Sequence, residues 1–155
     1  MSFRKLDVST ITEEKQILLD RITQVNTEPG ANEEAERKFQ SKSSQVRAFI
    51  TKGNALEALA QAISEPPYGL KDSSIPDKSA QLVMDVLASS RSQDAVSIIG
   101  DLAENQRVVL LKYIYYMMAR PAYFNCSMLL SWHEKIVQVS GIGSICRVLS
   151  DRHTL

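Results

Sequence analysis

The sequence predicts an all-α domain of about seven short helices packed as antiparallel neighbours. Apolar residues recur at helical spacing along nearly the whole chain, and no segment shows the alternation of a half-buried strand. The 6 glycines and 5 prolines gather where the apolar stripes end, as expected of residues that stop helices. With 155 residues, 44% of them hydrophobic and 23% charged, the chain can bury a core as one domain.

Residues 1–31 are predicted to be an N-terminal extension, and residues 32–155 the globular domain. Thr10 and Glu13 have the spacing of a capping box, and an apolar stripe behind them predicts a helix. Pro29 and Gly30 then break the chain before the first helix of the domain.

Two helices are predicted in the first part of the domain. One starts near Glu33 and stops at Gly53, a residue type common just beyond helix ends. Asn54 is expected to cap the next, with Glu57 three residues later, and the Pro66-Pro67 pair follows its end.

A polar loop is then expected up to Pro76 and Asp77. The helix after it places four apolar residues on one face: Ala80, Val83, Met84 and Leu87. Ser92 is a candidate cap for a short helix that Gly100 closes.

Residues 108–118 are apolar almost all round. A helix without a wide polar face is central and buried, so this segment is expected to lie in the middle of the domain. Pro121 follows its end.

Two helices are predicted at the C-terminal end, joined at a Gly-x-Gly-Ser corner. Asn125 can cap the first of them. Its stripe is Leu129, Trp132, His133, Ile136 and Val137, and the last helix carries Ile145, Val148 and Leu149. The residues predicted to pack at this corner are Trp132, His133, Gly141, Gly143, Ser144 and Arg147.

The same region holds residue types that bind zinc, namely Cys126, His133, Cys146 and His153. Seven residues of one helix rise about 10 Å, which is too far for two ligands of one tetrahedral zinc. The sequence therefore predicts no metal site.

Other catalytic patterns are incomplete. His133-Glu134-Lys135 lacks the second histidine of a zincin, because position 137 is valine. The Gly141-Ile142-Gly143 turn follows a helix and not the strand of a dinucleotide-binding unit. A thiol enzyme using Cys146 with His133 remains an alternative. No catalytic residue and no cofactor are predicted.

Composition bears on partners and on location. Eighteen basic and eighteen acidic residues give a net charge of zero, which offers no reason to expect nucleic acid or a membrane surface. The N-terminus has no apolar core of a secretory signal, so the two cysteines are expected to be reduced and the protein cytoplasmic.

Two resemblances suggest a function. "GNALEALAQAI" before the two prolines resembles a helix of a tetratricopeptide hairpin, which suggests a free-standing helical adaptor. "LLSWHEKIVQVSGIGSICRVLSDRHTL" resembles the C-terminus of the actin-related protein 2/3 complex subunit 5 family. "FRKLDV" near the N-terminus, "GNALEAL" followed by "PPY", and "LLKYIY" resemble further segments of that family, in order. Residues 9–40 depart from its pattern.

The family resemblance implies an all-α superhelical, non-catalytic subunit of the complex that nucleates branched actin filaments. It implies that the chain docks on subunit 4 and on the β-propeller subunit 1 and contacts actin filaments only indirectly. It also implies a location in the cytoplasmic actin cytoskeleton, including cortical actin patches. The N-terminal arm would tether the actin-related protein 2 subunit. The residues of the arm expected to bind are Phe3, Arg4, Lys5, Leu6, Asp7 and Val8.

Overall fold

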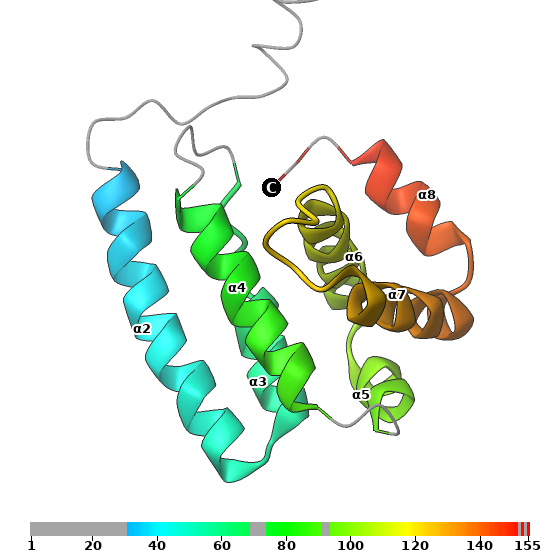
Figure 1. Cartoon of the computed structure of the whole chain (residues 1–155), viewed down its shortest axis with the longest axis horizontal. Coiled ribbons are helices and arrows are strands. Elements are labelled where there is room, and N and C mark those ends of the chain that lie inside the picture. Colours follow the sequence, from blue (N-terminus) through cyan, green and yellow to red (C-terminus); the bar gives the residue numbers. More distant parts are fainter. Residues whose placement is uncertain (1–30, 69–73, 91–93, 152, 154) are drawn as a thin grey trace, which may run out of the picture.

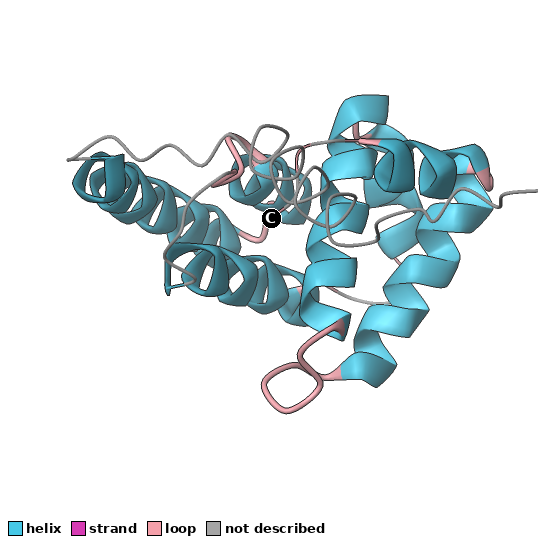
Figure 2. Ribbon diagram, turned by 90° about the horizontal axis from the view of Figure 1, so that it is seen from above, coloured by secondary structure: helices cyan, strands magenta, loops and turns pink. Residues whose placement is uncertain are grey.

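A computed structural model describes residues 31–68, 74–90, 94–151, 153 and 155. In these ranges the chain forms seven helices and no strand, so the predicted all-α class is confirmed (Figure 2). The helices are α2 (Ala31–Lys52), α3 (Ala55–Ile63), α4 (Ser74–Ser89), α5 (Ala95–Asp101), α6 (Glu104–Met118), α7 (Cys126–Ser140) and α8 (Gly143–Ser150). The predicted helix behind Thr10 and the six binding residues of the arm lie outside the described residues.

The seven helices form two groups. In the first, α2, α3 and α4 run up and down beside one another, so that chain neighbours are antiparallel (Figure 1). In the second, α7 contacts α5, α6 and α8, and α8 also lies against α6. Contacts of α6 with α3 and α4 join the groups into one superhelical body.

The core is continuous and α6 lies at its centre, as its all-round apolar sequence predicts. Leu110, Leu111, Tyr113, Ile114 and Met117 of this helix are buried. The residues flanking this stretch are only half-buried, because the ends of α6 reach the surface. Helix α6 therefore links the two groups of helices, because α3 and α4 pack against it from one group and α7 and α8 from the other.

Some turns that join the helices follow local sequence and others differ from it; the candidate cap Ser92 lies outside the described residues, and Asp94 stands at the N-cap position of α5. Gly53 ends α2 with a φ of 78°, as predicted. Asn54 occupies the N-cap position of α3 as predicted, but its side-chain oxygen accepts no capping bond, and its amide donates to Glu57 at 3.1 Å. Helix α4 begins at Ser74, ahead of Pro76, because proline is compatible with the first turn of a helix. Helix α5 ends at Asp101, one residue beyond the predicted stop.

Candidate interaction surfaces and the C-terminal helix corner

The corner between α7 and α8 is built from local hydrogen bonds. At the start of α7 the Asn125 carboxamide accepts from the backbone amides of Ser127 and Met128, at 3.1 and 3.4 Å, which confirms its predicted capping role. Gly141 ends the helix with φ 74° and ψ 173°, a combination that glycine alone adopts readily. The buried Ser144 hydroxyl donates to the Gly141 carbonyl at 2.7 Å. These contacts make the corner a well-defined turn.

Trp132 and His133 lie on the side of α7 that meets the core. The Trp132 side chain is buried within the core cluster. His133 is half-buried, and its Nε2 lies 2.9 Å from the hydroxyl of Tyr115 on α6. The rings of His133 and Tyr115 are tilted against each other with their centroids 5.5 Å apart. Both residues therefore hold α7 against the central helix.

Gly143 and Arg147 belong to α8 and face different surroundings. Gly143 is the first residue of the helix, with open space around the position where a side chain would begin. The Arg147 guanidinium forms an ion pair with Glu104 at the start of α6. This pair is exposed on both sides, and such pairs contribute little to stability.

The residues with catalytic or metal-binding chemistry are dispersed. Cys126 and Cys146 are both free, and Cys146 is exposed. His133, its hypothetical base, is hydrogen-bonded to Tyr115. Among the described residues, no three of the His, Cys, Asp and Glu side chains are grouped so that they could hold a metal ion.

A buried lysine is the feature that the sequence analysis missed. Lys112 stands in the apolar stretch of α6, and its side chain is only 7% exposed. Its ammonium group lies 2.7 Å from Asp151 Oδ2 and 2.8 Å from the His153 carbonyl, and it donates to the Tyr68 hydroxyl at 3.3 Å. It also lies 4.7 Å from the centre of the Tyr68 ring. The only signal in the sequence was a charge on a helix that is otherwise apolar all round.

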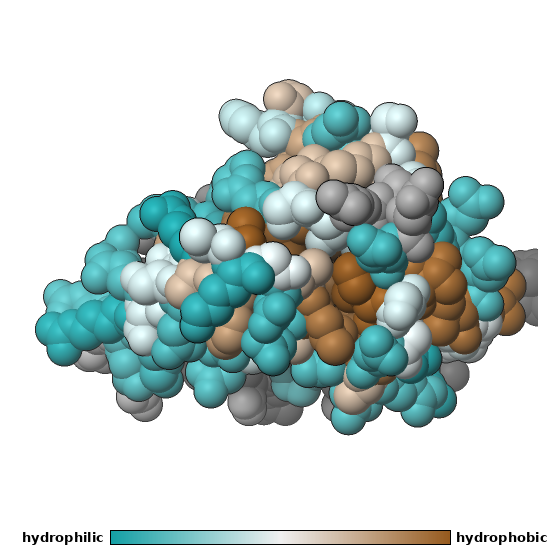
Figure 3. All heavy atoms as spheres, turned by 90° about the horizontal axis from the view of Figure 1, so that it is seen from below, coloured by the Kyte–Doolittle hydropathy of each residue, from teal (hydrophilic) through white to brown (hydrophobic). Residues whose placement is uncertain are grey.

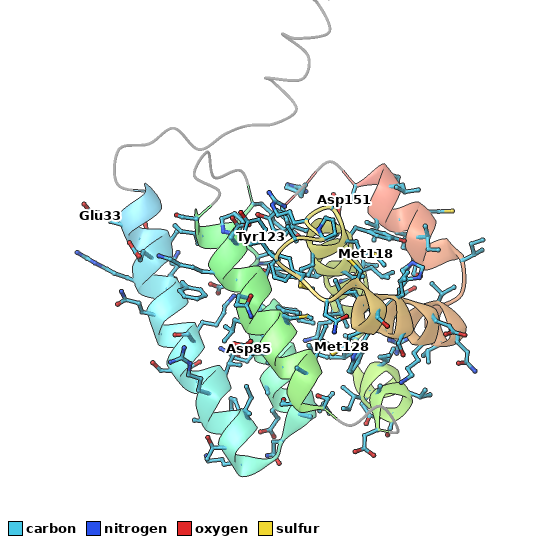
Figure 4. The ribbon with its side chains drawn as sticks, viewed as in Figure 1. Glu33, Asp85, Met118, Tyr123, Met128 and Asp151 are labelled. Carbon is cyan, nitrogen blue, oxygen red and sulfur yellow. The ribbon has the colours of Figure 1, made fainter. Side chains whose placement is uncertain are left out.

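The Asp151 carboxylate accepts hydrogen bonds from Lys112 and from the backbone amide of His153. It follows α8 directly and lies beside α6 (Figure 4). The bond from Lys112 and the backbone amide of His153 hold the pKa of the Asp151 carboxyl well below its usual range. The same carboxylate thus receives an ammonium from one helix and an amide from the segment that follows another.

A second polar cluster joins α4 to α6. Tyr116 donates to Asp77, and the Arg120 guanidinium lies 3.9 Å above the centre of the Tyr116 ring. Burial, together with the bond to Asp77, raises the pKa of Tyr116 to about 12. The cluster fixes the first turn of α4 against the second half of the central helix.

Large apolar side chains remain exposed on the second group of helices and its loops. Their exposed fractions are 43% for Val96, 81% for Tyr123, 56% for Leu130, 74% for Ile142 and 77% for Leu149. Leu149, one of the three apolar residues that the sequence places on the last helix, is exposed, and only Ser144 of α8 is buried. Figure 3 shows apolar surface gathered on the half of the molecule away from α2, where α5 and α7 lie. None of the described helices has the length and apolarity needed to cross a membrane.

An all-α body whose C-terminal helices present apolar side chains to solvent defines a helical protein-interaction module. The family model of the ARP2/3 complex 16 kDa subunit (p16-Arc) matches residues 2–155. The chain belongs to this family, which consists of structural subunits rather than enzymes. The resemblance of its C-terminal block to that family is confirmed.

Curated relatives agree with the family match. Actin-related protein 2/3 complex subunit 5-C of Xenopus laevis is 32% identical over 153 residues, which cover 99% of this chain and 94% of the relative. Actin-related protein 2/3 complex subunit 5 of Saccharomyces cerevisiae is 33% identical over 120 residues, 77% of each chain. The subunit 5-like protein of Homo sapiens is 29% identical over 154 residues, or 99% of this chain and 94% of the relative.

Proposed function

We propose that this chain is a non-catalytic structural subunit of the actin-related protein 2/3 complex and supports the nucleation of branched actin filaments. Its family membership over residues 2–155 and the names of its relatives support this function. It would act in the cytoplasmic actin cytoskeleton, including cortical actin patches, and would contact filaments only through the complex.

The helical body would dock on subunit 4 and on the β-propeller subunit 1 of the complex. The observation that carries this proposal is the set of exposed apolar side chains on α7, α8 and the corner between them. Leu130, Ile142 and Leu149 are each more than half exposed. Burying such side chains at an interface is favourable, and the fully buried centre of an interface is more apolar than its rim.

Residues 1–31 would form an arm that tethers the actin-related protein 2 subunit. Within it Phe3, Leu6 and Val8 supply apolar anchors. Arg4, Lys5 and Asp7 can set the register. An arm of this kind raises the effective concentration of one partner near the other once the body has docked. It therefore strengthens an assembly without a large interface of its own.

Reconstitution of the complex with surface variants tests the docking proposal. Leu149→Glu and Leu130→Glu place a charge where a partner would bury an apolar side chain, so both should lower retention by subunits 1 and 4 in pull-downs. Ala48→Glu on α2 introduces the same charge at an exposed position in the other group of helices and is the matched control. Retention of both leucine variants at the level of Ala48→Glu would contradict this surface.

Truncation tests the arm. Deleting residues 1–30 leaves α2 whole and should leave a folded body that still binds its body partners. The truncated chain should hold the actin-related protein 2 subunit more weakly when the complex is washed at rising salt. If the truncated chain unfolds, the proposed boundary of the domain is wrong.

Co-purification separates this function from the free-standing adaptor. A subunit should be recovered with actin-related proteins at equal stoichiometry. Recovery of the chain as a monomer without them would favour an independent helical adaptor of the tetratricopeptide kind.

A further inference from the structure

Lys112 is the only charged residue that is buried among the residues the structure describes. Its neighbours in sequence on α6 are apolar or aromatic, so the helix itself offers the ammonium group no counter-charge. A charge removed from water is very costly unless an opposite charge and hydrogen bonds compensate it. The folded chain must therefore place an opposite charge and hydrogen-bond acceptors beside the Lys112 ammonium group.

Two of the three polar partners of Lys112 come from the last five residues of the chain. Asp151 supplies the carboxylate and His153 a backbone carbonyl, at 2.7 and 2.8 Å. Tyr68, in the loop after α3, supplies the third contact, and its ring lies 5.5 Å from that of His153. Leu155 is half-buried against the core. The end of the chain is thus packed onto the body at three of its described residues.

Helix α8 lies against α6 and α7, but few of its side chains are buried there. It spans eight residues, and only Ser144 among them is buried. Apart from half-buried packing by residues such as Val148, its side-chain link to α6 is the exposed pair of Arg147 with Glu104. A helix this short is unstable in isolation and depends on tertiary contacts. The contacts that follow it in the chain are therefore well placed to decide whether it stays docked.

We propose that Asp151, His153 and Leu155, at the end of the chain, form a strap, anchored by the buried ammonium of Lys112, that fastens α8 to the central helix. The strap covers a charge that no other part of the described chain neutralises. It also sets the position of two exposed apolar side chains, Ile142 just before α8 and Leu149 near its end. Releasing the strap would free α8 while the other helices stay packed.

Hydrogen exchange on the full chain, read by mass spectrometry, tests the strap. Lys112→Met keeps most of the side-chain volume, removes the buried charge and removes the anchor. We expect this variant to unfold at the same temperature as the unaltered chain or higher, because no charge needs compensation. The amides of α8 should nevertheless exchange at least about tenfold faster, since they would open locally without global unfolding.

Asp151→Ala gives the complementary result, because it leaves the ammonium group buried without its carboxylate. This variant should show fast amide exchange in α8 and a lowered unfolding temperature. Adding Lys112→Met to Asp151→Ala should restore the unfolding temperature, while the amides of α8 should still exchange fast. Asp101→Ala removes an exposed carboxylate at the end of α5 and is the matched control. Exchange in α8 as slow in Lys112→Met as in Asp101→Ala would overturn the proposal.

Discussion

The hydroxyl of Tyr116 donates a hydrogen bond of 2.6 Å to Oδ1 of Asp77, across 39 residues of sequence. This bond ties the central helix α6 to the first turn of α4, and the guanidinium of Arg120 lies over the Tyr116 ring with its Nε 3.6 Å from the same carboxylate oxygen of Asp77. The two groups of helices are therefore joined by a directional polar contact in addition to their apolar core.

Tyr116→Phe should lower the free energy of unfolding by about 1 kcal/mol. Hydrogen bonds to charged groups contribute about 1.5–3 kcal/mol, and the value here is reduced because Asp77 is nearly half exposed and keeps Arg120 beside it. Chemical denaturation followed by circular dichroism measures the change. Tyr123→Phe, at an 81% exposed position, should have no effect, and equal stability of the two variants would refute the role of the bond.

Tyr113→Phe should leave stability unchanged or raise it by up to about 1 kcal/mol. Tyr113 is fully buried, and its hydroxyl makes no hydrogen bond of standard geometry among the described residues, although the Ser79 side chain is near enough to act on the pKa of the phenol. Burial raises the pKa of this phenol far above its usual range. Because a buried polar group without a partner costs free energy, removing the hydroxyl relieves that cost. A clear loss of stability in the same denaturation assay would mean that the hydroxyl is bonded in solution.

The two corner glycines should respond in opposite directions to alanine. Gly141→Ala forces a side chain into a backbone conformation that costs about 1–3 kcal/mol, so it should destabilise the chain by that amount. Gly143→Ala places the side chain in open space at the first residue of α8, and should be neutral or stabilising by up to about 1 kcal/mol. Thermal unfolding of the two variants measures the difference, and equal effects would show that backbone conformation is not what requires Gly141.

The stabilising effect of Asp151 should be lost in acid. The Lys112 ammonium and the His153 amide lower the pKa of this carboxyl in the folded chain, so folding favours its ionised form. The Tyr68 hydroxyl also faces Lys112. The contribution is complete above the ordinary aspartate pKa, about 4, and declines as the pH falls below that value.

The variant Asp151→Asn tests this pH dependence of stability directly. The gap in unfolding temperature between the unaltered chain and this variant should be constant from neutral pH down to about pH 5 and should narrow below about pH 4. The other carboxylates titrate in both proteins and cancel in the comparison. A gap that stays constant at the lowest pH at which the chain folds would show that the Asp151 pKa is not lowered.

Local sequence was sufficient to predict the elements whose causes are local. The Asn125 cap and the stops at Gly53 and Gly141 depend on one residue and its immediate neighbours. Asn54 stands at the predicted N-cap position of α3, but its side chain makes no capping bond, and its amide donates to Glu57, three residues away. A residue type that favours the N-cap position does not guarantee a capping bond, because the folded geometry decides where its side chain points.

Contacts between distant segments were not predictable in the same way. The charge of Lys112 was visible in the sequence, but its partner Asp151 lies 39 residues later, and nothing in the intervening pattern pairs them. The stripe of α8 likewise did not reveal which of its apolar residues meet the core. Half-buried Val148 and exposed Leu149 are adjacent in sequence and have similar hydropathy.

By itself, the sequence determined that this protein is a chain of helices with a buried central member and a C-terminal corner, because helix periodicity, capping and termination act over a few residues. Its segments were also distinctive enough to place it in its family. The tertiary structure alone decided which helices meet, which apolar side chains stay in solvent, and that Asp151 and His153 contact Lys112. These are matters of packing and of compensating a buried charge, and they depend on groups that only the folded chain brings together.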